Sequence, residues 1–147
     1  MMKKFLKKKL GNEKGMTLIE LLAVIVILAI IAAIAIPAIS NIIENSRVGA
    51  VKSDAQMALS AANLYFTDDP TAASPVSVQT LLDNNYLQDK GSLDAANTKI
   101  TKVTGGNTIT GKGSNGVVID FAGATNTLIN ALKNSENGDG TIIKVTR

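Results

Sequence analysis

The sequence predicts an α+β fold in which an N-terminal helix of about 50 residues carries a small antiparallel sheet packed on its second half. Three observations lead to this prediction. Residues 21–36 form a run of sixteen residues without a polar side chain. The residues that follow, to about Phe66, keep an apolar stripe at helical spacing. Further on, short segments rich in β-branched residues alternate with glycine and asparagine turn signals.

Residues 1–15 differ from the rest of the chain in charge. They carry six lysines against one glutamate, a net charge of +5, whereas the nine basic and eleven acidic side chains of the remainder give −2. An excess of lysine beside an apolar segment is typical of the cytoplasmic side of a membrane. We therefore interpret residues 1–15 as a cleaved basic leader, with an amphipathic membrane-surface helix as the alternative.

Residues 16–39 are long enough to cross a membrane. Their 24 residues reach about 36 Å at ~1.5 Å per helical residue, and the hydrocarbon core of a bilayer is roughly 30 Å thick. Glu20, near the start, is the anomaly, because a carboxylate in a membrane segment is costly enough to indicate a function and a partner. Pro37 and Gly49 are weak points of the helix, since proline removes a hydrogen bond and glycine has a low helix propensity.

An ordinary secretory signal is the alternative interpretation of this region. Such a signal is cut after its apolar part, at small-residue sites of the kind that residues 33–35 and 38–40 offer. The length of the apolar run and Glu20 at its head count against this alternative.

From Ser40 the chain is expected to continue as an amphipathic helix to about Phe66, with its apolar stripe as the core face of a domain. Apolar residues recur every seven positions, with further apolar residues beside them: Ile36, Ile43, Ala50, Met57 and Leu64, supported by Ile39, Val51, Ala58, Ala62 and Tyr65. The sequence Asp68-Asp69-Pro70 is expected to end the helix.

The remaining elements are predicted to be short. A serine- and alanine-rich connection over 71–77 leads to them. The pattern predicts a helix over 78–85, hairpin strands over 98–104 and 107–110 around a Gly105-Gly106 turn, a strand over 116–121, a helix over 125–134 and a last strand over 141–146.

The residues around the start of the apolar run resemble a known family. A lysine-rich leader ends in Gly15, Met16-Thr17-Leu18-Ile19-Glu20 leads directly into the apolar helix, and Pro37 follows about six turns further on. This combination resembles the type IV prepilins and their relatives, the pseudopilins of type II secretion and competence systems. The resemblance covers residues 1–66. One departure is Met16, because the family most often has phenylalanine at that position.

The resemblance implies a pilin fold and a series of maturation steps. A prepilin peptidase cuts after Gly15 and methylates the new amino group of Met16. The precursor has a single pass through the bacterial cytoplasmic membrane with its N-terminus inside. Mature subunits then leave the membrane and assemble into a cell-surface filament, with residues 16–39 in the filament core and residues 40–147 as the globular head.

The resemblance also implies roles for two residues in assembly, Glu20 and Pro37. Glu20 is expected to pair with the Met16 amine of a neighbouring subunit, and the alternative is that it discharges the amine of its own chain. The expected partners are further copies of the chain, the prepilin peptidase, the pilus assembly machinery and, before assembly, the membrane. Nucleic-acid binding by this subunit alone is not expected, given the charge of −2 after residue 15.

Residue types that carry catalysis are scarce. The chain has no cysteine and no histidine, so thiol chemistry, disulfides and the commonest metal ligands are absent. Residues 136–140 lack the ligand spacing of a calcium loop and are expected to form a tight turn. Residues 111–114 lack the spacing of a phosphate-binding loop. We therefore expect no enzymatic activity, no cofactor and no metal site.

Three functions remain open from the sequence. The first is a structural subunit of a type IV pilus that serves adhesion, motility or biofilm formation. The second is a pseudopilin of a type II secretion or competence DNA-uptake system. The third is a membrane-anchored or secreted binding domain that never polymerises.

Overall fold

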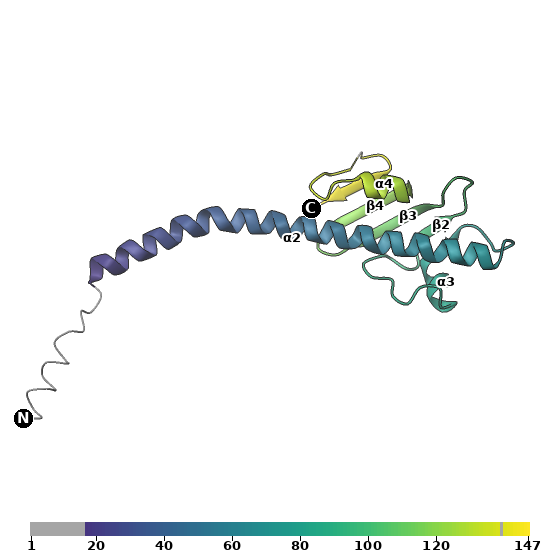
Figure 1. Ribbon diagram of the computed structural model, residues 1–147, viewed down its shortest axis with the longest axis horizontal. Coiled ribbons are helices and arrows are strands. Elements are labelled where there is room, and N and C mark those ends of the chain that lie inside the picture. The colour runs from purple at the N-terminus through teal and green to yellow at the C-terminus, as the bar shows by residue number, and fades with distance from the viewer. Residues whose placement is uncertain (1–16, 139) are drawn as a thin grey trace, which may run out of the picture. The chain divides into compact units, whose positions relative to one another are not determined.

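The structure of the protein is a computed structural model that describes residues 17–138 and 140–147. The chain divides into two compact units, Met1–Ser40 and Asn41–Arg147. Along the chain the elements follow the order α2, β1, α3, β2, β3, β4, α4 and β5 (Figure 1). The predicted leader, residues 1–15, and with it the expected cleavage residues Gly15 and Met16 lie outside the described residues.

Helix α2 spans Leu18–Asp68, 51 residues, and confirms the predicted long N-terminal helix. It continues through Pro37, although proline removes one helical hydrogen bond. The helix ends at the predicted place. There the Asp69 carboxylate accepts hydrogen bonds from the backbone nitrogen and the hydroxyl of Thr71, at 2.9 and 2.6 Å. Such side-chain contacts to the following backbone favour a turn over a further helical residue.

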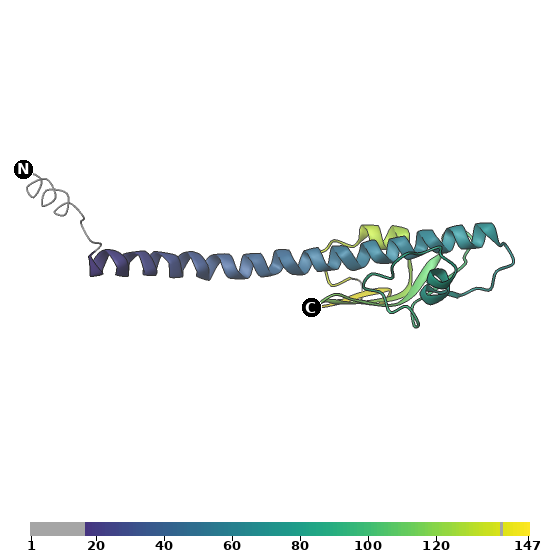
Figure 2. The same ribbon diagram turned by 90° about the horizontal axis from the view of Figure 1, so that it is seen from below.

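The described strands form one antiparallel sheet in the order β1-β2-β3-β4-β5. Their bounds are β1 Val76–Ser77, β2 Lys99–Thr101, β3 Thr108–Ser114, β4 Val118–Thr125 and β5 Ile143–Thr146. Figure 2 shows this sheet on one side of the second half of α2. The predicted α+β architecture is therefore confirmed.

Strand β3 is longer than predicted because of close backbone approaches. β3 continues past residue 110 through Gly111 and Gly113 to Ser114. A Cβ atom at Gly111 would lie 2.5 Å from the Cα of Thr98, and one at Gly113 would lie 2.3 Å from a methyl group of Val51. Glycine thus allows β3 to approach the chain just before β2 on one side and α2 on the other. The two-residue strand β1 was not predicted, since it is too short to show alternation.

The connection between β2 and β3 is not the tight turn predicted at Gly105-Gly106. Residues 102–107 form a wider loop instead. The Gly106 backbone nitrogen donates to the Val103 carbonyl at 3.1 Å, and the Val103 nitrogen donates to Asn107 Oδ1 at 3.3 Å. The Asn107 side chain therefore closes the loop, where a tight turn would have continued the backbone hydrogen bonds between β2 and β3.

Two short helices lie directly after strands. They are α3, Val78–Asp83, and α4, Asn126–Ala131, and both confirm helices predicted from the sequence. The Ser77 hydroxyl accepts from the Thr80 nitrogen at 3.0 Å, and the Thr125 hydroxyl accepts from the Leu128 nitrogen at 3.3 Å. The last residue of each strand thus caps the helix that follows, so no loop is needed between them.

The hydrophobic core lies between the sheet and a face of α2 that matches the predicted one only in part: Val51, Ala58 and Ala62 are buried as predicted. The buried residues of α2 are Val48, Val51, Ala55, Ala58, Leu59, Ala61, Ala62 and Phe66. Ile43, Met57 and Leu64 are instead 46%, 51% and 60% exposed, so the seven-residue stripe is not the core face. A seven-residue repeat drifts by about 20° per heptad around a straight helix. The small alanines of the neighbouring face permit closer packing of the sheet.

Two cations fasten the C-terminal part of the head to α2. Lys52 Nζ donates to Asn134 Oδ1 at 3.2 Å, and Arg147 Nη2 donates to the Asn134 carbonyl at 2.6 Å. Arg147 also lies 3.7 Å from the Glu44 carboxylate. A Cβ atom at Gly49 would lie 2.9 Å from the Asn134 amide nitrogen, which accounts for a glycine inside the helix. In a chain without cysteine, these contacts hold the segment after α4 in place.

Candidate functional site

The first half of α2 exposes its apolar side chains on every side. Leu18 is 88% exposed and Ile34 is 72% exposed, and every other leucine, isoleucine and valine up to Ile39 is at least 46% exposed. By length and composition, α2 is able to cross a membrane, and none of its most apolar window is buried. Soluble monomers rarely expose contiguous apolar patches beyond a few hundred Å². This surface therefore requires lipid or other apolar helices around it.

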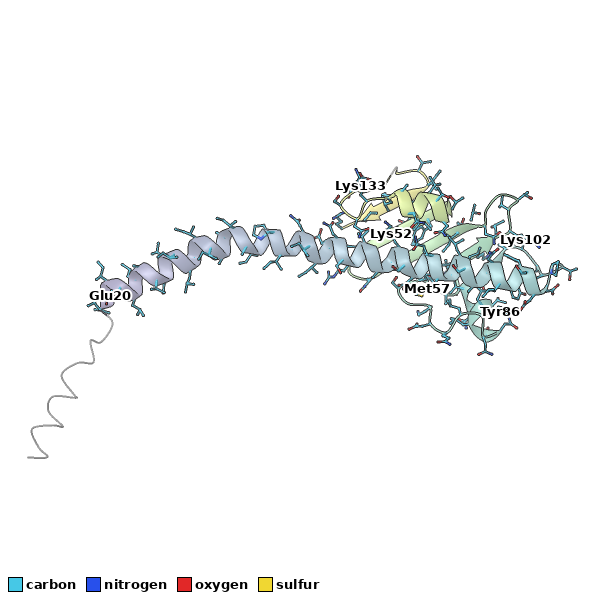
Figure 3. All side chains as sticks on the ribbon, viewed as in Figure 1. Glu20, Lys52, Met57, Tyr86, Lys102 and Lys133 are labelled. Atoms are coloured by element: carbon cyan, nitrogen blue, oxygen red, sulfur yellow. The ribbon has the colours of Figure 1, made fainter. Side chains whose placement is uncertain are left out.

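Glu20 lies in the first turn of this helix (Figure 3). Its Oε2 atom accepts hydrogen bonds from the backbone nitrogen of Thr17 at 2.7 Å and from the Thr17 hydroxyl at 2.9 Å. In return the Thr17 hydroxyl accepts from the Glu20 nitrogen at 3.2 Å. This reciprocal pair is a capping box, which satisfies backbone amides that have no partner inside the helix. It was not predicted, although the spacing of Thr17 and Glu20 is its sequence signal.

The capping box changes how Glu20 is tolerated in apolar surroundings. A carboxylate in hydrocarbon is costly when it has no hydrogen-bond donors. Here the Thr17 amide and hydroxyl supply two of them, both to the same oxygen. A carboxylate has about four acceptor positions, so Glu20 can accept a further donor while it caps the helix. The expected donor, the Met16 amine, lies outside the described residues.

Pro37, the other expected assembly residue, lies in the same exposed apolar half of α2. It is 17 residues from Glu20, about 25 Å along a helix at ~1.5 Å per residue. The structure therefore places the two residues on one element but does not bring them together. Any shared role in assembly must act through the helix that connects them.

Titratable groups in the head serve packing and turns. The Tyr86 hydroxyl donates to Asp68 at 2.9 Å, and this hydrogen bond raises the pKa of Tyr86. Partial burial lowers the pKa of Lys52, and hydrogen bonds from Asn97 lower the pKa of Asp94. Among residues 17–138 and 140–147, no three His, Cys, Asp or Glu side chains are grouped so that they could hold a metal ion. Residues 111–114, considered above as a phosphate loop, lie within β3.

Comparison with known proteins gives a result for the N-terminal region. A family model described as the prokaryotic N-terminal methylation motif matches residues 10–36. This range contains the leader end, Gly15, Met16, Glu20 and most of the exposed apolar run. Searches among curated proteins and among solved structures found no match.

The fold is a long N-terminal helix that carries a small α+β head, and its exposed apolar half fits a membrane-anchored precursor. The matched motif is the type IV prepilin-like signal, and it supports a precursor of the type IV pilin or pseudopilin type. Precursors with this signal are processed by a prepilin peptidase for assembly. Such precursors mature into pilin-like structural subunits.

Proposed function

We propose that the chain is the structural subunit of a type IV pilus, with roles in adhesion, motility or biofilm formation. The precursor resides in the cytoplasmic membrane with its lysine-rich leader inside. A prepilin peptidase cuts after Gly15 and methylates the amine of Met16. The observation that carries the proposal is the exposed apolar half of α2, most of which lies within the methylation motif.

Burial of this helix explains how subunits leave the membrane without exposure to water. Each buried leucine or isoleucine side chain contributes roughly 1.5–3 kcal/mol relative to water. A bundle of identical apolar helices offers surroundings as apolar as lipid, and small residues allow the helices to approach closely. Alanines suited to this role are present at positions 23, 29, 32, 33, 35 and 38. Transfer from lipid to a filament core is therefore close to neutral in hydrophobic free energy.

Glu20 gives the assembly its specificity. The nearest basic side chain after the leader is Arg47, 27 residues away, or about 40 Å along the helix at ~1.5 Å per residue. The amine that cleavage creates at Met16 is the one cation close in sequence. Pairing of Glu20 with the Met16 amine of a neighbouring subunit sets the axial register and admits only processed subunits. Until that pairing forms, the Thr17 capping box keeps the carboxylate solvated by donors.

Pro37 has a mechanical role in this proposal. It removes one hydrogen bond from the apolar half of α2 and weakens the helix there. A helix that can bend or open locally near Pro37 can adjust to neighbours in the filament core. The head, residues 40–147, then extends from the core to the filament surface.

The test is direct imaging of cells that express the chain, combined with the mass of the purified filament protein. A pilus subunit gives long surface filaments whose protein begins with N-methyl-Met16. If wild-type cells have no surface filaments and the protein instead forms short fibres within the cell envelope, the result indicates the pseudopilin alternative. An unpolymerised protein whose N-terminus is Ile36 or Ile39 refutes both and supports a secreted domain.

A further inference from the structure

A groove of about 630 Å³ runs along the second half of α2. Its apolar lining comes from Met57, Ala61 and Leu64 on the helix and from Tyr86 and Leu87 in the loop after α3. Asp89 lies at its rim and is exposed. Figure 3 shows Met57 and Tyr86 on the same side of α2.

Two apolar residues of the groove, Met57 and Leu64, do not belong to the head's own core, whereas Ala61 and Leu87 do. Met57 and Leu64 are 51% and 60% exposed, while the neighbouring face of α2 packs on the sheet. The rim is polar, with Gln56 and Gln88 among its lining residues. An exposed apolar patch with a polar rim is the usual composition of a protein interface. Met57 and Leu64, which the sequence predicts as core, are thus available for a contact outside the subunit.

The opposite flank of the head carries a surface of matching chemistry. Figure 1 shows α4 on one side of α2 and α3 on the other. On α4, Leu128 is 39% exposed and Ala131 is exposed. The Lys133 side chain follows and is 77% exposed. This flank therefore offers partly exposed apolar side chains beside a cation, whereas the groove offers an apolar cleft beside the carboxylate of Asp89.

The ion pair that Lys133 already makes does not prevent a new one. Its Nζ lies 3.3 Å from the Glu136 carboxylate, but both side chains are largely exposed. Surface pairs of this kind contribute little to stability. Lys133 can therefore leave Glu136 and pair with the carboxylate of another subunit in a partly desolvated contact.

We infer that the groove of one subunit receives Leu128 and Lys133 of a second copy of this chain. The inference rests on the proposed filament and names the contact between heads that accompanies the helix core. The two surfaces lie on different elements, so the contact is heterologous. In a dimer, one subunit still has a free groove and the other still has a free Leu128 and Lys133 surface. Heterologous contacts that do not close into a ring extend into open helical polymers, as a filament requires.

Cysteine pairing tests the contact in assembled filaments of the full chain. The chain contains no cysteine, so every disulfide arises from the introduced pair. Leu64→Cys combined with Leu128→Cys should give a ladder of dimers, trimers and longer oligomers after oxidation, because each subunit links to two neighbours. Val103→Cys combined with Leu128→Cys is the matched control. Val103 is similarly exposed, at 45%, but lies outside the groove, and this pair should give no ladder.

Charge substitution tests the same contact without a cross-link. We expect Met57→Lys to lower filament yield at least about tenfold, since a buried apolar side chain at an interface centre commonly carries that much affinity. Val103→Lys should leave the yield unchanged. Asp89→Lys and Lys133→Asp should each lower the yield, and the combined variant should restore it. Equal amounts of precursor and mature protein in the cell membrane establish that each variant folds and is processed.

The outcomes separate this inference from the proposed function. If the Met57→Lys variant forms filaments at the wild-type yield and the cysteine pair at Leu64 and Leu128 gives no ladder, the proposed contact is wrong. The proposed function as a pilus subunit is not affected by that result. If the wild-type chain forms no filaments, the proposed function itself is wrong. Dimers alone from the cysteine pair would show a closed contact and also overturn the open head-to-tail arrangement.

Discussion

The carboxylate of Glu20 lies 2.7 Å from the backbone nitrogen of Thr17 and 2.9 Å from its hydroxyl, directly before the sixteen apolar residues 21–36. Glu20 therefore has a local partner whether or not a second subunit is present. In the proposed filament it has a second partner, the Met16 amine of a neighbour. Thr17 takes part only in the first of these contacts, so substitutions at the two positions can be compared.

Thr17→Ala removes the cap and should weaken the first turn of α2 by about 1 kcal/mol, the usual effect of losing a threonine at an N-cap. Glu20 remains but is held less firmly. We expect filament yield to fall about fivefold, the factor that such a free energy represents. Thr17→Ser keeps the hydroxyl and should retain wild-type yield. Sheared filament protein measured against total mature subunit gives the comparison, and an unchanged yield for Thr17→Ala would show that the cap has no part in assembly.

Processing is tested at Gly15. A Gly15→Val change places a branched side chain next to the bond that the peptidase must cut, so the precursor should accumulate at its full mass. The lysine-rich leader then stays attached, the Met16 amine is never formed, and filaments should be absent. Gly15→Ala, with a single methyl group, should be cut at a reduced rate. Mass spectrometry of the membrane fraction measures both, and normal maturation of Gly15→Val would argue against cleavage at this position.

Removal of the apolar half of α2 should leave a soluble head. A fragment that begins at Ser40 keeps all the buried residues of α2, which start at Val48, together with the sheet that packs on them. We predict a folded monomer at micromolar concentration, because the surface that needs lipid or other helices has been removed. Analytical ultracentrifugation and circular dichroism test this prediction. Oligomers as strong as those of the full chain would place the main assembly interface in the head.

Alanine substitutions at two glycines of the sheet distinguish the effect of a steric collision from that of backbone strain in that fragment. Gly111 and Gly123 both have positive φ, 151° and 77°. A Cβ atom at Gly111 would lie 2.5 Å from the Cα of Thr98, whereas a Cβ atom at Gly123 would meet nothing within 4 Å. Gly123→Ala should therefore lower the free energy of unfolding by about 1–2 kcal/mol, from strain alone. Gly111→Ala should lower it by more than about 3 kcal/mol, since backbone must move. Urea denaturation measures both, and equal effects would contradict the close approach of Thr98.

The long helix and the order of the later elements could be predicted because they depend on local signals. The apolar run, the break at Asp68-Asp69-Pro70 and the β-branched segments each act within a few residues. The core face of α2 could be predicted only in part: Val51, Ala58 and Ala62 are buried as expected, but Met57 and Leu64 are exposed. A seven-residue spacing identifies Met57 and Leu64 as a stripe, but burial depends on where the sheet packs, and it packs on the alanine-rich neighbouring face.

The extent of β3 was unpredictable for a related reason. Gly111 and Gly113 read as strand breakers from their propensity, yet in the fold they are the residues that let β3 approach Thr98 and Val51. For the site, the sequence marks Glu20 as exceptional because a carboxylate interrupts apolar residues. It leaves the local partner unassigned until the Thr17 spacing is considered as a capping box.

The strongest prediction concerns Glu20 itself. Glu20→Gln keeps the shape of the side chain and its acceptor for the Thr17 amide, but it removes the charge that a neighbouring Met16 amine requires. Glu20→Ala removes both. If the ion pair between subunits sets the register, both variants should be cleaved and inserted normally and yet give no filaments when they are the only subunit. Glu20→Asp should partly retain filaments, because the charge remains on a shorter side chain.

If Glu20 served only as a helix cap, the Gln variant would assemble almost normally, since glutamine also completes a capping box. Electron microscopy of cells, with immunoblots for mature subunit as the control for processing, distinguishes these results. Filament yield at the wild-type level from Glu20→Gln alone would refute the pairing.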